Sequence, residues 1–366
     1  MTTFSVEMLP AKHGDALWIE YADGGLTRRI SIDGGPIQAY DAMAERMARL
    51  PDGDKLVELL VVTHVDTDHI EGMIRMMAAP RAKWPIDPQD IWFNGYRHIR
   101  PLDDLGGREG EMISALISAR DHGSWNKAFK CEAVMIEEGT DLPELSLAGG
   151  MKLTLLSPDR EKLDQMAVKW KKDLKKFTMK PGDMEAAWKQ LASLPRFKLD
   201  QENTLGSDDL GEELRKLLKG QDGSDANGSS IAFLARCHGK SCLFLADAHI
   251  DLINKSLAKL VAKEGAPLKV DAVKVSHHGS KNNLDARFFD LVDAKHYLIS
   301  TNGDHHDHPD APAMEAIIAG SKREPVLWFN YRSEHTLPYE ARSKLAGQRF
   351  TTRYPPEGEE GIVVDL

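Results

Sequence analysis

The sequence predicts an α/β fold in which two β-sheets pack face to face and helices cover both outer surfaces, an αββα sandwich with a helical insertion. Three observations predict it. Short strand-like segments come first and lead into alternating helices and strands. The same alternation resumes after residue 226. Between these halves, residues 159–226 form long polar segments that favour helix. We therefore expect a single domain over residues 1–366, with 159–226 inserted into it.

The first half of the chain is expected to open with three short strands and then to alternate helices with strands. Strands are indicated where β-branched and aromatic residues gather between turn residues, and helices where apolar residues recur at three- to four-residue spacing. The strands expected on this basis are Phe4–Leu9, Ala16–Tyr21, Arg29–Ile32, Leu56–Val62, Asp90–Phe93 and Met151–Leu156. Helices are expected near residues 39–50, 70–77 and 111–119.

The second half repeats this pattern of strands and helices. Its expected strands are Ser230–Ala235, Ser241–Ala246, Asp271–Val275 and Tyr297–Thr301, and a helix is expected at about 250–263.

The predicted insertion is basic. From Asp159 to Lys198, eleven Lys or Arg residues stand against six Asp or Glu residues, with four aromatic residues among them. A segment of this kind can face a polyanion. An amphipathic helix pair whose lysines form a solvated face explains the same pattern, and that simpler explanation is the more common one.

The composition is that of a soluble globular protein. In 366 residues, a hydrophobic fraction of 42% and a charged fraction of 28% exclude a disordered chain, and no apolar run could cross a bilayer. We expect no membrane partner and, because the N-terminus lacks a secretory signal, a cytoplasmic location. The net charge of −10 excludes a protein that coats nucleic acid over its whole surface. Three cysteines without C-x-x-C spacing are expected to be reduced thiols.

Four metal-ligand side chains directly follow the expected strand Leu56–Val62. They are His64, Asp66, Asp68 and His69, within six residues of one another. The Asp residues could instead form a turn or cap the helix that follows. Imidazoles and carboxylates at this density, placed where a strand ends, are nevertheless what a metal site requires. We therefore predict a metal site here.

Three later strands also end in candidate ligands. Asp247 follows Ser241–Ala246, His277-His278 follow Asp271–Val275, and the stretch Asn302–Pro309, with three histidines, follows Tyr297–Thr301. One such residue at a strand end is usually structural. Four strand ends of this kind in one chain indicate convergence on a shared centre. A pair of divalent ions needs a bridging carboxylate, terminal ligands and an open position for water, and this set of side chains supplies the protein ligands.

These residues resemble the metallo-β-lactamase fold superfamily, whose signature is His-x-His-x-Asp-His followed by a distant Asp and His. Asp66 stands where the second His is usual. This departure is similar to a narrower branch with His-x-Asp-x-Asp-His, which includes the hydrolase domain of DNA-uptake competence channel proteins and phosphorylcholine esterases. Further motifs similar to that branch are His13-Gly14-Asp15-Ala16, Ile32-Asp33-Gly34-Gly35, Leu153–Pro158, Asn227–Ser230, Lys274–Ser280 and His308-Pro309.

The resemblance implies a role for each ligand residue. His64, Asp66 and His278 would hold one ion, Asp68, His69 and His308 would hold the other, and Asp247 would bridge them. Asp68 and His277 would take part in catalysis, His277 as a phosphate donor or general acid. Two choices stay open at this stage: His277 or His278 as the ligand, and His308 or one of His305 and His306. Two zinc ions are expected, with manganese and iron as the alternatives.

The resemblance implies a dinuclear hydrolase that uses metal-bound hydroxide. A phosphodiesterase is expected, and its partner is a phosphoester substrate, for which nucleic acid is one candidate. Two alternatives remain. One is a hydrolase of carboxylic esters, lactones or thioesters with the same metals. The other is a conflict or toxin-type module whose insertion, 159–226, recruits a partner.

Overall fold

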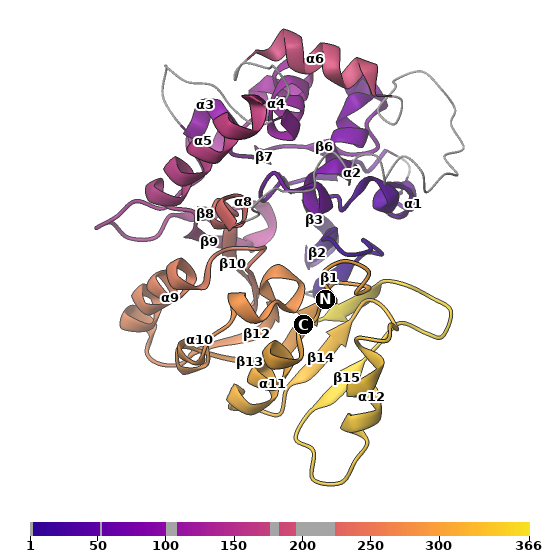
Figure 1. Cartoon of the computed structure of the whole chain (residues 1–366), viewed down its shortest axis with the longest axis vertical. Helices are drawn as coiled ribbons and strands as arrows, with labels where there is room; N and C mark the ends of the chain where they lie inside the picture. The colour runs from indigo at the N-terminus through magenta and orange to yellow at the C-terminus, as the bar shows by residue number, and fades with distance from the viewer. Residues whose placement is uncertain (1–2, 52, 100–107, 176–182, 195–223) are drawn as a thin grey trace.

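Two large β-sheets pack against each other in the structure, a computed structural model that describes residues 3–51, 53–99, 108–175, 183–194 and 224–366. Figure 1 shows helices on both sides of this pair of sheets, so the predicted αββα architecture is confirmed. In spatial order, the first sheet contains β16 (Ile362–Asp365), β1 (Thr3–Met8), β2 (Leu17–Asp23), β3 (Leu26–Ile32), β5 (Leu59–Val61) and β7 (Ile91–Trp92).

The second sheet contains five parallel neighbours, from β15 to β11, followed by antiparallel strands. Its order is β15 (Thr351–Arg353), β14 (Val326–Phe329), β13 (Val292–Ile299), β12 (Leu268–Lys274), β11 (Lys240–Phe244), β10 (Ala232–Cys237), β9 (Lys152–Ser157) and β8 (Glu144–Ser146). Two short strands, β4 (Leu56–Val57) and β6 (Asp87–Pro88), pair separately.

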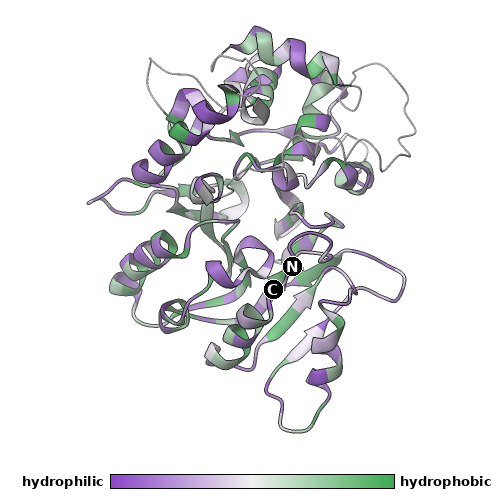
Figure 2. Ribbon diagram, in the orientation of Figure 1, coloured by the Kyte–Doolittle hydropathy of each residue, from purple (hydrophilic) through white to green (hydrophobic). Residues whose placement is uncertain are grey.

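The helices fall into two groups, one for each sheet. Helices on the side of the first sheet are α1 (Tyr40–Ala48), α2 (Thr67–Ala78), α3 (Tyr96–Ile99), α4 (Arg108–Asp121), α5 (Arg160–Lys175) and α6 (Met184–Ser193). Helix α8 (Ser224–Gly228) packs with them through Ala226. Helices associated with the second sheet are α9 (Ile250–Glu264), α10 (Ala286–Leu291), α11 (Ala311–Gly320) and α12 (Leu337–Ser343). Figure 2 shows hydrophobic residues along the central strands and mixed hydropathy around outer helices such as α9.

The side chains of the first sheet alternate between two hydrophobic cores, one on each face of the sheet. In β2, Leu17, Ile19 and Tyr21 belong to a core that contains side chains of both sheets. Trp18 points the other way and packs in a second core with α1, α2, α4, α5 and α6. Because successive side chains of a strand point to opposite faces, a strand that is apolar on both faces must lie between two layers.

The expected strand Leu56–Val62 is interrupted at Glu58. Its first two residues form β4, whereas Leu59–Val61 form β5 in the first sheet. Glu58 lies at the break, where its backbone N–H donates to the carbonyl of Arg29 and its side chain pairs with Arg28. A pattern that is apolar except at Glu58 could not reveal that the strand changes its pairing partner there.

The C-terminal part of the chain completes both sheets. Sequence patterns gave no expectation for β14, β15 and β16, three short strands at 326–329, 351–353 and 362–365. β16 pairs antiparallel with β1, with Ser5 opposite Asp365. The two ends of the described chain therefore lie side by side in the first sheet (Figure 1).

Part of the predicted insertion is helical as expected. α5 and α6 pack through Leu163, Trp170 and Leu191 into the core on the helix side of the first sheet. The remaining segments, 176–182 and 195–223, lie outside the described residues. The assignment of 159–226 as one insertion therefore stays a prediction.

Two further expectations concern cysteines and membranes. Cys131, Cys237 and Cys242 form no disulfide bond, and the latter two are buried. Within the described ranges, no helix combines the length and the apolar character needed to span a bilayer.

Glycines allow α2 to pack directly on the loop that follows β3. Gly72 of α2 donates a backbone hydrogen bond to the carbonyl of Gly35 (3.0 Å), and Gly34 donates to that of His69 (2.8 Å). A Cβ on Gly72 would lie 2.1 Å from the carbonyl oxygen of Gly34. No side chain fits between these backbones, so the glycines fix where the first turn of α2 lies.

We predict that Gly72→Ala destabilises the protein by about 1–3 kcal/mol. Alanine favours a helix by about 1 kcal/mol over glycine, but the clash with the Gly34 backbone outweighs that gain. Gly123→Ala is the matched control, because a Cβ there meets nothing within 4 Å. Urea unfolding measures both variants, and equal midpoints would contradict this account of the packing.

Candidate metal centre

The loops that follow four strands meet at one place. β11, β12 and β13 are neighbouring parallel strands, so their carboxyl ends lie at one edge of the second sheet, and the end of β5 faces them from the first. These loops hold the predicted site residues: His64 and Asp66 after β5, Asp68 and His69 in the first turn of α2, Asp247 after β11, His277 and His278 in the turn η7 (Ser276–Gly279) after β12, and His308 after β13.

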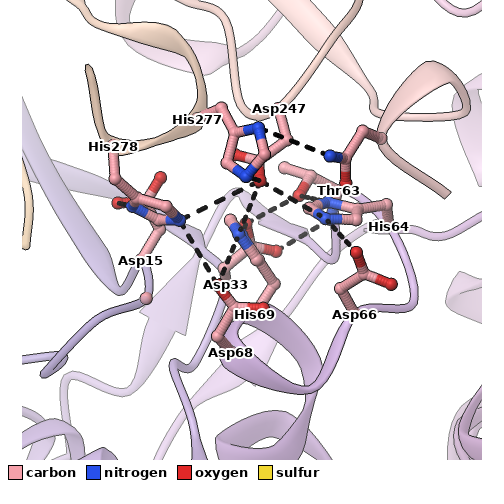
Figure 3. Close-up of polar contacts among 12 residues, drawn as sticks. Asp15, Asp33, Thr63, His64, Asp66, Asp68, His69, Asp247, His277 and His278 are labelled. Atoms are coloured by element: carbon pink, nitrogen blue, oxygen red, sulfur yellow. Dashed lines mark hydrogen bonds and ion pairs between the residues drawn. The ribbon is translucent and has the colours of Figure 1, made fainter. Parts of the chain in front are cut away.

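The carboxylate of Asp247 lies at the centre of the cluster (Figure 3). The Nε2 atoms of four imidazoles surround its Oδ2, at 3.4 Å for His69, 3.7 Å for His277 and 3.9 Å for both His64 and His278. A buried carboxylate with several imidazoles is a ligand set that suits zinc and other divalent transition metals.

The buried atoms of this cluster fit a metal. Nε2 of His64, His69 and His278 and Oδ1 of Asp247 are buried without a hydrogen-bond partner. A buried nitrogen or oxygen atom without a hydrogen-bond partner destabilises the folded protein unless another atom or ion binds to it. These histidines and Asp247 belong to groups of side chains that could hold a metal ion.

Hydrogen bonds on the far side of each ring support the same conclusion. Nδ1 of His69 contacts Oδ2 of Asp33 (2.8 Å), and Nδ1 of His278 contacts the carbonyl of Ser300 (2.9 Å). Nδ1 of His64 contacts Oγ1 of Thr63 (2.9 Å). An imidazole that donates from Nδ1 keeps its Nε2 lone pair for a metal, and this is the usual arrangement of metal-bound histidine.

The ligand atoms form two groups that differ from the expected partition. His64, His69 and Asp247 come together in one group, and Asp68, His69 and His278 in the other. Nε2 of His278 lies 3.3 Å from Oδ2 of Asp68, so His278 faces Asp68 rather than Asp66, with which the resemblance had paired it. The complete ligand set stays a prediction.

Asp66 and His308 lie at the edge of the cluster. Oδ2 of Asp66 is 3.8 Å from Nε2 of His64. His308 belongs to neither group of candidate ligands among the described residues. Its ring stands 5.5 Å from that of His277, and its Nδ1 is 3.5 Å from Oδ1 of Asp310. The rings of His305 and His306 are exposed and lie 4.0 Å apart.

The charges within the cluster shift the pKa values of its members strongly. Burial, with help from the nearby His69, lowers the pKa of His64 to about 3. Burial also opposes the charge of His69, but the carboxylates of Asp247 and Asp68 outweigh it and raise the pKa of His69 well above its ordinary value. Burial together with Asp68 raises the pKa of Asp66 to about 7. Without a metal, His69 is therefore a cation held between carboxylates.

Asp33 is a site residue to which the sequence assigned no role. Its carboxylate accepts from the backbone N–H of Thr63 (2.8 Å), from Oγ1 of Thr63 (2.7 Å) and from Nδ1 of His69 (2.8 Å). Since the Thr63 hydroxyl donates to Asp33, it accepts from His64, so one carboxylate orients two imidazoles. In the sequence, the indication of a role for Asp33 was its position directly after β3. A single Asp at a strand end is usually structural, so this position alone did not assign the role.

Similarity to known proteins is confined to solved structures. No model of a protein family matches the sequence, and no curated protein matches it. All of the chain is similar to all of YhfI, a metallo-β-lactamase fold protein of Bacillus subtilis, at 9% identity and a TM-score of 0.41. A diphosphatase of the PhnP family is similar over 99% of this chain and 98% of its own, at 12% identity and a TM-score of 0.38.

A mutant of the β-hydroxylase CmlA is similar over 100% of this chain, at 12% identity and a TM-score of 0.39, and the chain spans 54% of that protein. At identities and scores this low, the chemistry of the site rests on this chain's own residues. The narrower resemblance, to competence channel proteins and phosphorylcholine esterases, stays a prediction.

We predict that Asp33→Asn weakens metal binding by about 10–100-fold, the usual effect of removing a hydrogen-bond partner of a ligand. The new amide would present an N–H to the donors of His69 and Thr63. Asp90→Asn is the matched control, because Asp90 is also a buried carboxylate that accepts several hydrogen bonds, from Lys127, Ala128 and Trp92. Competition with a metal-sensitive dye measures both affinities, and equal affinities would exclude the role of Asp33.

We also predict that metal binding releases protons at pH 7. The raised pKa of His69 means that a metal must displace a proton there, so the affinity should increase with pH, by up to about tenfold per unit for each proton released. Isothermal titration calorimetry in buffers of different ionisation enthalpy measures the release. Binding heats that are the same in all buffers would contradict a protonated His69.

Proposed function

We propose that the chain is a dinuclear metal-dependent hydrolase that acts on phosphodiesters. Zinc is the expected metal, with manganese and iron as alternatives. The observation that carries the proposal is the set of buried, unpartnered Nε2 atoms around the carboxylate of Asp247. Divalent ions held there would lower the pKa of a water molecule to about 7 and stabilise charge on the leaving oxygen.

One side of the cluster is open to a substrate. The side chains of His64, His69, His278 and Asp247 are at most 3% exposed, whereas those of Asp66, Asp68 and His277 are 22–25% exposed. A substrate must therefore approach from the side of these last three residues. Asp68 and His277, the two residues expected to take part in catalysis, both lie there.

The surroundings of the open side favour an anionic substrate. From His277, histidine rings continue in a row through His308 (5.5 Å), His306 (5.9 Å), His305 (4.0 Å) and His13 (5.1 Å), with each distance between neighbouring ring centroids. Imidazole N–H groups donate well to phosphate oxygens, which carry the charge that a carboxylic ester lacks. Lys169 of the basic helix α5 adds positive charge that acts on Asp66. Nucleic acid is one phosphodiester that fits these features.

We predict that the wild type hydrolyses bis-(p-nitrophenyl) phosphate with zinc or manganese, and that His64→Ala and Asp247→Ala each lose more than about 100-fold in rate. Removing only a hydrogen-bond partner of a ligand typically costs about 10–100-fold, so removing a ligand should cost more. The control is His122→Ala, which replaces an exposed histidine outside the cluster.

The same assay with p-nitrophenyl acetate and a chromogenic lactone tests the alternative substrate class. Metal content and circular dichroism are measured on each purified variant. Full phosphodiesterase activity in a metal-free His64→Ala or Asp247→Ala variant would rule out metal-dependent catalysis. Faster turnover of the acyl esters than of the phosphodiester would move the assignment to a carboxylic ester hydrolase.

A further inference from the structure

Hydrogen bonds determine which nitrogen of His277 carries the proton. Nδ1 of His277 lies 3.1 Å from Oδ1 of Asn283. The orientation of the Asn283 amide is fixed, because its Nδ2 donates to the carbonyls of Asp247 and Ala248, each at 3.3 Å. Its Oδ1 must therefore accept a proton from Nδ1 of His277. In the neutral ring, the lone pair is then on Nε2.

A second amide near His277 does not change this assignment. Nδ2 of Asn227 lies 3.4 Å from Nδ1 of His277, the longer of the two contacts. Nδ1 of His277 donates its proton to Oδ1 of Asn283, whose amide is held in place by two carbonyls. It therefore cannot also accept a hydrogen bond from Nδ2 of Asn227. Asn227 can hydrogen-bond to this nitrogen only through its own amide oxygen.

The lone pair of His277 points toward the metal centre. Nε2 of His277 is 3.7 Å from Oδ2 of Asp247, close to the 3.9 Å that separates Nε2 of His64 from the same oxygen. Figure 3 shows the ring of His277 beside Asp247, between the rings of His278 and His64. His277 thus resembles His64, His69 and His278 in that its Nδ1 is engaged and its Nε2 faces Asp247, although His277 belongs to neither group of candidate ligands among the described residues.

The backbone of η7 is built to present two imidazoles at once. His277 and His278 both adopt left-handed conformations, with φ of 47° and 55°. Such conformations are unfavourable for residues with a Cβ and persist only where the surroundings enforce them. Here the N–H of His277 donates to the carbonyl of Ala246 (2.9 Å), and the two ring planes stand at 75° to each other.

We propose that His277 is a ligand of the ion on the His64 side, and that Asn283 is the residue that positions it. The proposal rests on the metal centre described above and replaces the general-acid role expected from the sequence. The two ions would then have balanced ligand sets that share Asp247: His64, Asp66 and His277 for one, and Asp68, His69 and His278 for the other.

Metal counting tests this assignment without a substrate. We expect His277→Asn to bind about one zinc per chain instead of about two after equilibrium dialysis. Asparagine tolerates the left-handed backbone but is too short to reach the ion. His238→Asn is the matched control, because His238 is also left-handed, with φ of 50°, but exposed and outside the cluster. It should keep both ions.

A second variant tests the positioning role. Asn283→Ala should weaken one of the two zinc-binding steps by about 10–100-fold and leave the other unchanged. The absorption spectrum of the cobalt-substituted protein should change for His277→Asn and not for His238→Asn, because only the former removes a nitrogen ligand. Thermal unfolding verifies that each variant is folded.

The outcomes separate this proposal from the proposed function. If folded His277→Asn retains two zinc ions and the wild-type cobalt spectrum, His277 is not a ligand, and the metal-dependent hydrolase is unaffected. If the wild type itself binds no zinc, manganese or iron, the metal centre and both proposals are wrong. If His277→Asn binds one zinc ion and the wild type is inactive toward phosphodiesters, the role of His277 as a ligand is supported and only the proposed substrate is wrong.

Discussion

The buried ion pair between Asp15 and Lys274 joins the two sheets beside the metal centre. Nζ of Lys274, the last residue of β12, lies 2.7 Å from Oδ2 of Asp15, in the loop before β2, and both side chains are almost fully buried. The backbone of Asp15 also donates to the carbonyl of Asp68 (3.2 Å) and accepts from Gly35 (2.8 Å). Oδ1 of Asp15 lies 3.6 Å from Nδ1 of His278. Since breaking such a pair leaves an unpaired buried charge, at a cost of about 3–5 kcal/mol, the loops that carry Asp68 and His278 depend on it.

This constraint matters because each sheet carries only half of the site. The first sheet and α2 supply His64, Asp68 and His69, and the second sheet supplies Asp247 and His278. Both groups of candidate ligands contain residues of both halves. A metal bound there would hold the two sheets together, so its binding free energy would add to the stability of the folded chain.

Asp66 differs from the buried ligands in its electrostatics. Its side chain lies at the open side, and burial together with the charge of Asp68 raises its pKa to about 7. Two neighbouring carboxylates disfavour each other's ionisation, and a nearby cation removes that penalty. A divalent ion beside His64 would therefore stabilise the charged form of Asp66. The residue that departs from the usual histidine is therefore one whose charge state would depend on the metal.

The sequence by itself determined the fold class and most of the side chains at the centre, because apolar strands that end in His or Asp are local patterns. It could not determine how those side chains would divide between two ions, since His278 and Asp68 meet only when the two sheets pack. It also could not reveal the hydrogen bonds that Asp33 makes with His69 and Asn283 with His277. The strand β16 was missed because its partner, β1, is at the other end of the chain. Local chemistry can be read along the chain, whereas ligand partition and tautomers arise from contacts that only tertiary packing creates.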